Sequence, residues 1–540
     1  MNLLLLCRLL SFVAMLIGGS MAFSLPWALP VCGGQWQYEQ GGFVGLLVSM
    51  VICFAVGGLL WWLGRKSKGK QLFRKEAMAV VGLSWILAAL LGALPYLLSG
   101  ASCAKDRKMD AVDAVFEAQS GFTTTGATVL TELEDYDLVP KCILFWRSST
   151  HFLGGLGIIV LFVAILGQGS AGKALMRAEM PGPGQAGQQA RMQHTAWVLF
   201  LIYVVLNGIL TVLLQLQGLS LFDSLCHAFG TMATGGFSTY NLSVGHFATV
   251  PGLNAPLIEM TIAAFMVLAG TNFMLLYFLA VGKPKRMFGN VEWRTYMAVM
   301  VIVTLLVVGF GLYNHDFGSH SGMQATEKLA QQTAPEDGAA LGTAFRYSIF
   351  QVVSIMTTTG FCTDDFNLWC SFSLGILLML MFVGGCAGST GGGLKVIRHI
   401  LFTKILRLEV EHAFRPSVVR PLRLGGEPVE DPGMRTNILV YFGLILLIST
   451  CSWLFTITVE PDSTWTDYGH ETEQKLIDGA GCVAATLNNI DPGLGVIGAT
   501  KSYTNFTWPS KILFILLMMI GRLEIFVILV LFVPGFWRTQ

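Results

Sequence analysis

Long apolar segments recur along the whole chain and are separated by shorter polar stretches. Several of these segments reach the roughly 20 residues that an α-helix needs to cross a bilayer. The pattern therefore predicts an all-α polytopic membrane protein. Spanning helices are expected at about 3–30, 41–63, 76–99, 143–167, 195–217, 255–281, 294–313, 371–410 (broken), 435–457 and 510–535.

Four intervals between predicted spans share one pattern. They read DAVFEAQSGFTTTGA from Asp113, DSLCHAFGTMATGGF from Asp223, YSIFQVVSIMTTTGF from Tyr347 and DGAGCVAATLNNIDP from Asp478. Each joins an apolar segment that is too short to span a bilayer to a polar turn. When the four are aligned without gaps, one column holds Gly126, Gly236, Gly360 and Asp491. The aspartates that open three of the units are expected to cap short helices.

Segments this short must enter and leave the membrane on the same side. Non-helical backbone is tolerated at that depth only where protein buries it or where it lines a water-filled cavity. Four such units, each between two spanning helices, predict a ring around one pore. The alternative, four polar or glycosylated outer loops, does not explain why the preceding segments are apolar.

The polar turns are expected to form an ion filter. Threonine should keep the backbone extended, and glycine reaches dihedral angles that other residues avoid. Carbonyl oxygens can then point inward and replace an ion's water shell. The expected filter positions are Thr124, Thr125, Gly126, Thr234, Gly235, Gly236, Thr358, Thr359, Gly360, Asn488, Asn489, Ile490 and Asp491.

The stretch GGCAGSTGGGLK from Gly384 interrupts the eighth predicted span. A phosphate-binding loop is disfavoured because Leu394 occupies the lysine position of that motif and no strand precedes it. A glycine-rich helix-packing surface is possible, but an intramembrane gating loop below the filter is favoured. Lys395 either assists this gate or marks the cytoplasmic end of the break. The expected gate positions are Gly384, Gly385, Gly388, Ser389, Thr390, Gly391, Gly392, Gly393, Lys395 and Arg522.

Arg522 lies in the middle of the last predicted span. A charge there costs roughly 2.5–3.5 kcal/mol on insertion scales, and such residues usually face the protein interior and have partners. Pairing with Glu524 or snorkelling to the interface are the alternatives. Contact with carbonyl oxygens of the 384–393 loop is favoured, because a fixed positive charge there would hinder cations in the closed state.

Composition and charge support a membrane location. Of 540 residues, 54% are hydrophobic and 12% are charged, about half the charged fraction of a soluble domain. Lys and Arg gather in alternate linkers, which places both termini in the cytoplasm, and the outward loops are acidic enough to concentrate cations. The basic block 395–423 suits a cytosolic partner or anionic lipid. The net charge of +1 gives no indication of nucleic-acid binding.

Residues for other chemistry are missing from the pattern. The eleven cysteines lie mostly in apolar runs and none has CxxC spacing, so they are expected to be small packing residues. The predicted spans hold no paired aspartates, Ser/His pair or HExxH motif. An intramembrane enzyme is therefore not expected.

The fourfold repeat resembles the superfamily of bacterial Trk and Ktr proteins and plant high-affinity potassium transporters. The resemblance covers nearly the whole chain and is closest to the Trk-type potassium uptake subunit, with two extra helices before the first repeat. Further matching stretches are HFLGGLGIIVL from His151, RAEMPGP from Arg177, GGCAGSTGGGLK from Gly384 and NNIDPGLG from Asn488.

The resemblance implies four helix–pore helix–helix repeats in a pseudo-four-fold arrangement within one chain. It also implies potassium as the transported ion, a location in the cell inner membrane, a homodimer, and cytosolic nucleotide-binding ring subunits that regulate transport, with no nucleotide on this chain itself. The potassium ligands are expected at Thr125, Thr234, Gly235, Thr359, Asn489 and Ile490. The expected units are an N-terminal helix pair with its basic linker at 1–75 and repeats at 76–180, 181–290, 291–425 and 426–540.

Asp491 departs from the family pattern, which has glycine in this column. Aspartate tolerates the left-handed backbone region better than most residues, so the turn is expected to persist. Its carboxylate is expected either near the pore, where it would tighten cation binding, or at the outer mouth. Either position would alter selectivity or flux.

A potassium symporter coupled to sodium or protons is the alternative mechanism. Coupled carriers usually have ionisable residues at the midplane or paired broken helices in inverted halves. Only one span of this sequence is clearly broken, and the repeat is fourfold. Both observations favour a channel-like path.

Overall fold

The computed structural model describes residues 2–30, 38–66, 73–155, 157, 192–314, 316–317, 337–417, 420–425, 427–428, 433–467, 474–523 and 525–538. These residues are mostly helical, with two small antiparallel hairpins, β1 (Ser102–Ala104) with β2 (Arg107–Lys108) and β3 (Arg423–Leu424) with β4 (Glu427–Pro428). The predicted all-α class is confirmed. The second half of the predicted span 143–167 and the RAEMPGP stretch lie outside the described residues.

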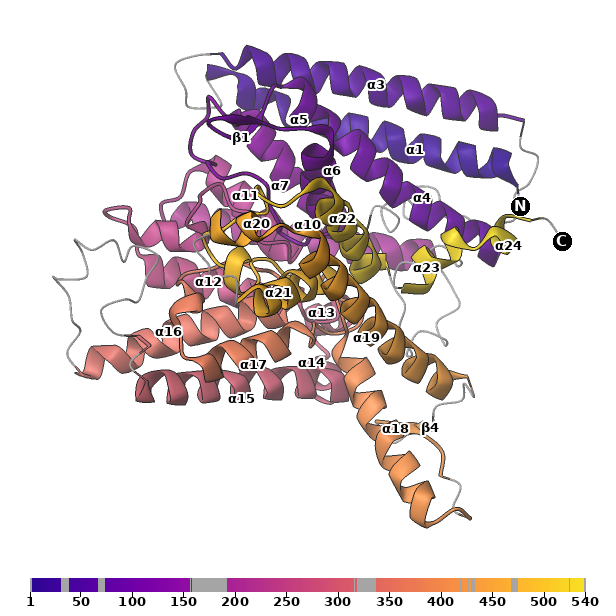
Figure 1. Cartoon of the computed structure of the whole chain (residues 1–540), viewed down its shortest axis with the longest axis vertical. Coiled ribbons are helices and arrows are strands. Elements are labelled where there is room, and N and C mark those ends of the chain that lie inside the picture. Colours follow the sequence, from indigo (N-terminus) through magenta and orange to yellow (C-terminus); the bar gives the residue numbers. More distant parts are fainter. Residues whose placement is uncertain are drawn as a thin grey trace.

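Two long helices precede the repeats and pack closely together. They are α1 (Leu3–Met21) and α3 (Gln40–Gly64), which run along one edge of the molecule (Figure 1). Small residues permit the close approach, since a Cβ atom added to Gly18 would lie 2.8 Å from the Cβ atom of Cys53. Glycines at such interfaces are common in membranes, where packing drives helix association.

Six described helical segments are long and apolar enough to cross a membrane, or seven if one bent pair counts as a single span. The six are Leu3–Ala28, Gln40–Gly64, Lys75–Leu98, Ala196–Leu216, Val291–Tyr313 and Met434–Val459. They include η1 (Leu25–Ala28), α4 (Arg74–Gly92), α5 (Leu94–Leu98), α10 (Met192–Leu216), α15 (Val291–Tyr313) and α19 (Met434–Val459). All six fall on predicted spans.

The bent pair corrects one prediction. The expected helix 255–281 is two helices, α12 (Ala255–Ala269) and α13 (Phe273–Ala280), which meet at 105°. Asn272 caps the second helix by accepting a hydrogen bond from the amide of Met274 at 2.8 Å. The expectation that only one span is broken is therefore wrong.

Two further spans end differently from a continuous helix. The eighth is broken as predicted, into α17 (Ser371–Met381) and α18 (Val396–Phe414), and α18 projects away from the body of the molecule (Figure 1). The last, expected at 510–535, divides into α22 (Trp508–Leu523) and α23 (Ile525–Leu529), followed by η6 (Val530–Phe532) and α24 (Pro534–Trp537). α7 (Lys141–Gly155) begins the fourth predicted span.

The four apolar segments of the repeat are helices. They are α6 (Ala111–Phe122), α11 (Leu221–Met232), α16 (Asp337–Met356) and α21 (Lys475–Asn488), of which α16 is longer than predicted. Asp110 and Ser220, not Asp113 and Asp223, cap the first two. The predicted capping aspartates lie within the first turn, where a carboxylate still interacts favourably with the helix dipole.

Buried side chains form two large clusters. One joins the N-terminal helices to the first and fourth repeats, and the other joins the second repeat to the third. Shorter elements lie between the longer helices within the repeats: η2 (Ser243–Ala248), α14 (Pro284–Phe288), η3 (Phe366–Leu368), α20 (Asp462–Asp467) and η5 (Gly495–Ile497). Residues at the turns belong to both clusters, Ala127 to the first and Phe361 and Ile490 to the second.

Candidate functional site

The four polar turns have nearly the same backbone. Two positions before the aligned column, φ is positive at Thr124 (53°), Thr234 (55°), Thr358 (62°) and Asn489 (55°). Non-glycine residues adopt this left-handed region rarely, so four occurrences in one register mark a repeated structure. The helix C-cap Thr123 has φ −77° and ψ 0°. The sequence predicted that the threonines keep the backbone extended, and this prediction is wrong.

The aligned column separates three repeats from the fourth. Gly126, Gly236 and Gly360 have φ of 90°, 78° and 87°. Asp491 does not share this positive φ, and the bond that joins it to Pro492 is cis. The expectation that Asp491 would adopt the left-handed backbone of its counterparts is wrong, and the fourth turn has its own geometry at this position.

Neighbouring turns touch one another and close a ring. A Cβ atom added to Gly126 would lie 2.5 Å from the carbonyl oxygen of Gly235, and one added to Gly236 would lie 2.1 Å from that of Thr359. A Cβ atom on Gly360 would lie 1.8 Å from the carbonyl oxygen of Asp491. The Asp491 amide donates to the carbonyl of Thr125 at 3.0 Å, which links the fourth turn to the first.

Side-chain hydrogen bonds hold the turns in place. The hydroxyls of Thr123 and Thr125 lie 2.9 Å apart, and those of Thr357 and Thr359 lie 2.7 Å apart. The amide of Asn489 donates to the Thr125 hydroxyl and to the carbonyl of Met518, both at 2.8 Å. Asn489 thus takes a position that threonine occupies in the other repeats and adds a bond between repeats.

A buried ion pair supports the ring between the first and second repeats. The guanidinium of Arg147 lies 2.6 Å from the Glu117 carboxylate, and both side chains are buried. Arg147 also donates to the carbonyl of Ser238 at 2.9 Å, and Glu117 accepts from the amide of Val129 at 2.9 Å. These contacts give Arg147 a structural role. Nothing in the sequence pattern pointed to Glu117.

His151 bridges the same two repeats. Its Nε2 accepts a hydrogen bond from the amide of Phe237 at 3.1 Å, so its Nδ1 carries the proton and donates to the carbonyl of Gly121 at 2.9 Å. The neutral imidazole is hydrogen-bonded at both nitrogens and so connects the first turn to the second.

The glycine-rich break packs directly against the turns. The amide of Gly392 donates to the hydroxyl of Thr358 at 2.9 Å. A Cβ atom on Gly392 would lie 2.7 Å from that of Asn489, and one on Gly393 would lie 2.8 Å from the carbonyl oxygen of Asn488. Larger residues would separate the break from two of the four turns.

The bent pair α12–α13 holds the other side of this break. The amide of Cys386 donates to the carbonyl of Gly270 at 2.9 Å, and the Asn272 amide donates to the carbonyl of Ala387 at 2.6 Å. Glu292 accepts from the amide of Ala387 at 2.7 Å. These anchors were not predicted, because the bend in the sixth span was read as continuous helix.

Two basic side chains reach the backbone of the break. Lys395 donates to the carbonyls of Gly391 and Gly392. Arg522 donates from Nη1 to the carbonyl of Thr390. Its Nη2 donates to the carbonyls of Gly154 at 2.6 Å and Gly155 at 2.9 Å. The expected contact between Arg522 and the 384–393 loop is present. Glu524, the alternative partner, lies outside the described residues.

A cavity of about 110 Å³ opens on the opposite face of the ring from the glycine-rich break. All four members of the aligned column line it, together with residues of the 499–502 loop. The four turns thus border this cavity, and two of them also contact the glycine-rich break.

Comparison with known proteins assigns this architecture. A family model described as TrkH, cation transport protein, matches residues 46–538. The chain belongs to the TrkH family of cation transport proteins. It is 35% identical over 507 residues to the Trk system potassium uptake protein TrkH of Escherichia coli K12, covering 93% of this chain and 94% of that protein. The TrkH of Halomonas elongata is 33% identical, with full coverage of both chains.

A solved structure supports the same assignment. The crystal structure of the potassium transporter TrkH from Vibrio parahaemolyticus matches with a TM-score of 0.80 and 30% identity over 100% of both chains. The resemblance read from the repeat is therefore confirmed at the level of family and fold.

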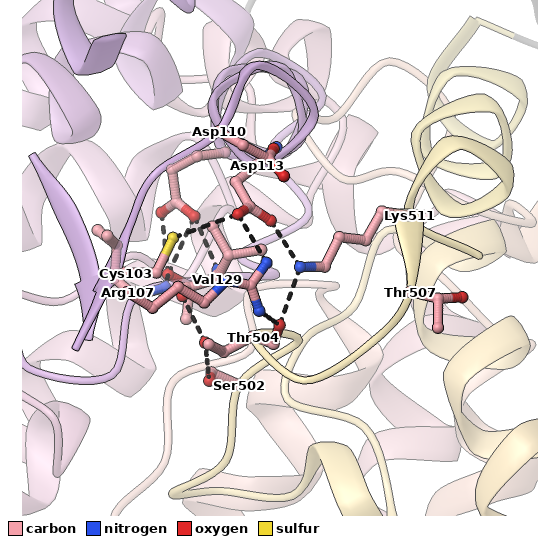
Figure 2. Close-up of polar contacts among 12 residues, drawn as sticks. Cys103, Arg107, Asp110, Asp113, Val129, Ser502, Thr504, Thr507 and Lys511 are labelled. Carbon is pink, nitrogen blue, oxygen red and sulfur yellow. Dashed lines mark hydrogen bonds and ion pairs between the residues drawn. The ribbon is translucent and has the colours of Figure 1, made fainter. Parts of the chain in front are cut away.

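One cluster of charges in this TrkH-family chain lies apart from the ring, where the first and fourth repeats meet. The Asp113 carboxylate lies 2.5 Å from the Lys511 ammonium and 2.9 Å from the Arg107 guanidinium (Figure 2). Both cations also donate to the carbonyl of Thr504. Burial raises the pKa of the nearby Cys103 thiol, which stays protonated and points at Asp113 from 3.6 Å. The cluster ties α6 to the loop before α22.

We expect Asp113→Asn to destabilise the protein by about 3–5 kcal/mol, because it leaves a buried ammonium without its counter-charge. Asp113 and Lys511 are 0% and 1% exposed. Thermal unfolding of the detergent-purified protein measures the loss. The exposed pair of Asp462 and Lys475 is the matched control, and Asp462→Asn should change stability by less than about 1 kcal/mol. Equal unfolding temperatures for the two variants would contradict the prediction.

Proposed function

We propose that this chain takes up potassium across the cytoplasmic membrane through a gated, channel-like pore. The observation that carries the proposal is the closed ring of four turns, each with a left-handed residue followed by a close contact with the next turn. Such a ring presents backbone carbonyls from four directions, which is how a filter replaces the water shell of a monovalent cation. The relatives named as potassium uptake proteins support potassium as the ion.

The proposed filter comprises residues 124–126, 234–236, 358–360 and 488–491. Potassium ligands are assigned to Thr125, Thr234, Gly235, Thr359, Asn489 and Ile490. No side chain in this set carries a positive charge that would repel a cation. The peptide oxygens supply the partial negative charges that bind it. α6, α11, α16 and α21 end at the turns, and their negative dipole ends favour a cation below the filter.

The proposed gate is the 384–393 break with Lys395 and Arg522. Its backbone lies against Thr358 and Asn489 on the side away from the entrance cavity. An ion leaving the filter would pass this loop and the two cations that hold it. Moving the loop would remove both the obstruction and the positive charges from the path.

The second candidate is a potassium symporter coupled to sodium or protons. The 105° bend between α12 and α13 favours it, because coupled carriers often bind ions at paired broken helices. This bend and the 384–393 break touch each other through Cys386 and Gly270. Against symport, the breaks occupy successive repeats of a fourfold arrangement and not equivalent places in two inverted halves.

Assembly and location are part of the proposal. We assign the chain to the cell inner membrane with both termini cytoplasmic, as a homodimer that contacts lipid and binds cytosolic nucleotide-binding ring subunits. The basic α18 region, which extends from the body of the molecule, is suited to such a partner (Figure 1). The chain itself is assigned no nucleotide, no nucleic acid and no catalytic activity.

Flux into proteoliposomes tests the function. We expect purified protein to admit potassium down its gradient, with sodium entering more slowly, and with no effect of an imposed pH gradient at constant voltage. Uphill potassium accumulation driven by a sodium or proton gradient would establish the symporter instead. Empty vesicles and a Gly360→Ala variant are the controls. Absence of potassium flux from protein that is folded and correctly inserted would overturn the proposal.

A further inference from the structure

We infer that the Asp491 carboxylate forms a cation-binding group at the outer entrance of the pore, a group that the other three repeats lack. This inference rests on the proposed function, since it concerns ions that approach the same filter. Gly126, Gly236 and Gly360 line the entrance without side chains, whereas Asp491 adds one carboxylate to the same cavity. The entrance is therefore asymmetric in charge.

The Asp491 carboxylate is buried in protein, yet few protein groups bind its oxygens. Asp491 is only 5% exposed and lines the entrance cavity. One oxygen accepts a hydrogen bond from the Tyr503 hydroxyl at 2.9 Å. Within the described residues no ion pair or second side-chain hydrogen bond involves this carboxylate. A cation in the cavity is a suitable partner for the remaining oxygen, because burial disfavours the ionised carboxylate unless a positive charge lies beside it.

Other charges around the cavity leave room for this role. Arg147 also lines it, but its guanidinium pairs with Glu117 at 2.6 Å. Lys501 lies on the part of the cavity wall formed by residues 499–502. Its charge acts on Asp365: burial raises the pKa of that carboxyl, and Lys501 lowers it. Arg147 thus has a carboxylate partner of its own, and the charge of Lys501 acts on a different acid from Asp491. Among the described residues that line the cavity, Asp491 is the one with an acidic side chain, and it lies directly beside the ring.

Tyr503 fixes the direction of the carboxylate. Its ring packs against those of Phe116 and Phe514, with centroids 5.1 Å and 5.5 Å away. Its amide donates to the carbonyl of Thr128 at 2.8 Å. A rigid aromatic side chain held at both ends keeps the hydroxyl, and hence the acid, in one place.

The loop that carries Tyr503 is held by the charge cluster of Figure 2. Lys511 and Arg107 both donate to the carbonyl of Thr504, the next residue, and the Thr504 hydroxyl donates to the carbonyl of Val129 at 2.5 Å. The cluster lies away from the ion path, so these residues position the site and do not touch the ion. The support for Asp491 thus runs from Asp113 through Thr504 and Tyr503.

A carboxylate at a pore entrance, kept ionised by the cation that it binds, raises the local concentration of cations. Asp491→Asn keeps the size of the side chain and its ability to accept from Tyr503 but removes the charge. We expect this variant to raise the external potassium concentration for half-maximal flux about fivefold or more at low ionic strength. Maximal flux at saturating potassium should stay within about twofold, because the carbonyl ring is retained.

The experiment compares concentration dependences in proteoliposomes of wild type, Asp491→Asn and Asp137→Asn. Asp137 is an exposed acid of the 131–140 loop that does not line the cavity, so its variant matches the change in net charge. A shift in the Asp491 variant alone supports the inference. Unshifted curves, or equal shifts in both variants, overturn it. Loss of all flux from the wild type would instead count against the proposed function.

A second variant guards against misfolding of the first. Tyr503→Phe keeps the carboxylate and the ring packing but removes the hydrogen bond to Asp491. We expect a shift of about threefold in the same direction, and competition by external barium should weaken in parallel in both variants. Wild-type behaviour of both the Asp491 and the Tyr503 variants in both assays would overturn the inference.

Discussion

Replacing Gly360 with alanine is expected to reduce potassium flux on the order of 100-fold, the scale of loss that a misplacement of about 1 Å produces at a site that depends on geometry. At φ 87° an L-residue is strained by roughly 1–2 kcal/mol. The added Cβ atom would also lie 1.8 Å from the carbonyl oxygen of Asp491. No rotamer relieves a clash with backbone, so one of the two turns must move.

The displaced oxygen belongs to the ring itself, which is why the effect should fall on transport more than on folding. Gly375 provides the control, since it lies in α17 and an added Cβ atom would meet no heavy atom within 4 Å. Gly375→Ala should keep wild-type flux, and both variants should be monodisperse after purification. Normal flux through Gly360→Ala would show that this turn does not line the ion path.

The four turns could be predicted from sequence because their information is local. Threonine or asparagine next to glycine, at a fixed distance from an apolar segment, specifies a helix end and a reversal within fifteen residues. The aligned register is repeated in the backbone, where Thr124, Thr234, Thr358 and Asn489 all have positive φ, although an extended backbone had been predicted at the threonines. It failed at Asp491, where proline follows and the backbone takes another course.

The bend in the sixth span was missed although a local signal was present. Gly270, Thr271 and Asn272 lie together in an otherwise apolar run, and asparagine is a favoured helix cap. The high hydropathy of both flanks concealed this signal, since a spanning helix is judged by length and apolarity. Asn272 is best explained after folding, when its amide reaches the carbonyl of Ala387 in another repeat.

The supports of the ring could not be read from sequence at all. Glu117 and Arg147 are thirty residues apart, and Asp113 and Lys511 lie at opposite ends of the repeat array. Whether such residues pair depends on how the repeats close on one another. A single sequence gives the chemistry of each side chain but not its neighbour across a closed ring.

Arg522→Ala is expected to raise potassium flux through the resting protein about tenfold to 100-fold. The guanidinium of Arg522 binds carbonyl oxygens of Thr390 in the break and of Gly154 and Gly155 at the end of α7. Hydrogen bonds that involve a charged group contribute about 1.5–3 kcal/mol, and each 1.4 kcal/mol is tenfold in an equilibrium constant. Losing them frees the loop from the neighbouring repeat.

A second variant of Arg522 separates the effect of its charge from that of its hydrogen bonds. Arg522→Lys keeps the positive charge but cannot span three carbonyls with a planar fork, so it should leak at a rate between those of wild type and Arg522→Ala. Arg435→Ala is the control, because Arg435 is exposed and pairs only weakly with Glu409 at 3.5 Å. Resting flux in vesicles without any cytosolic partner measures the leak. If Arg522→Ala stayed as tight as wild type, the break would be a packing surface and the barrier to ions would lie elsewhere along the path.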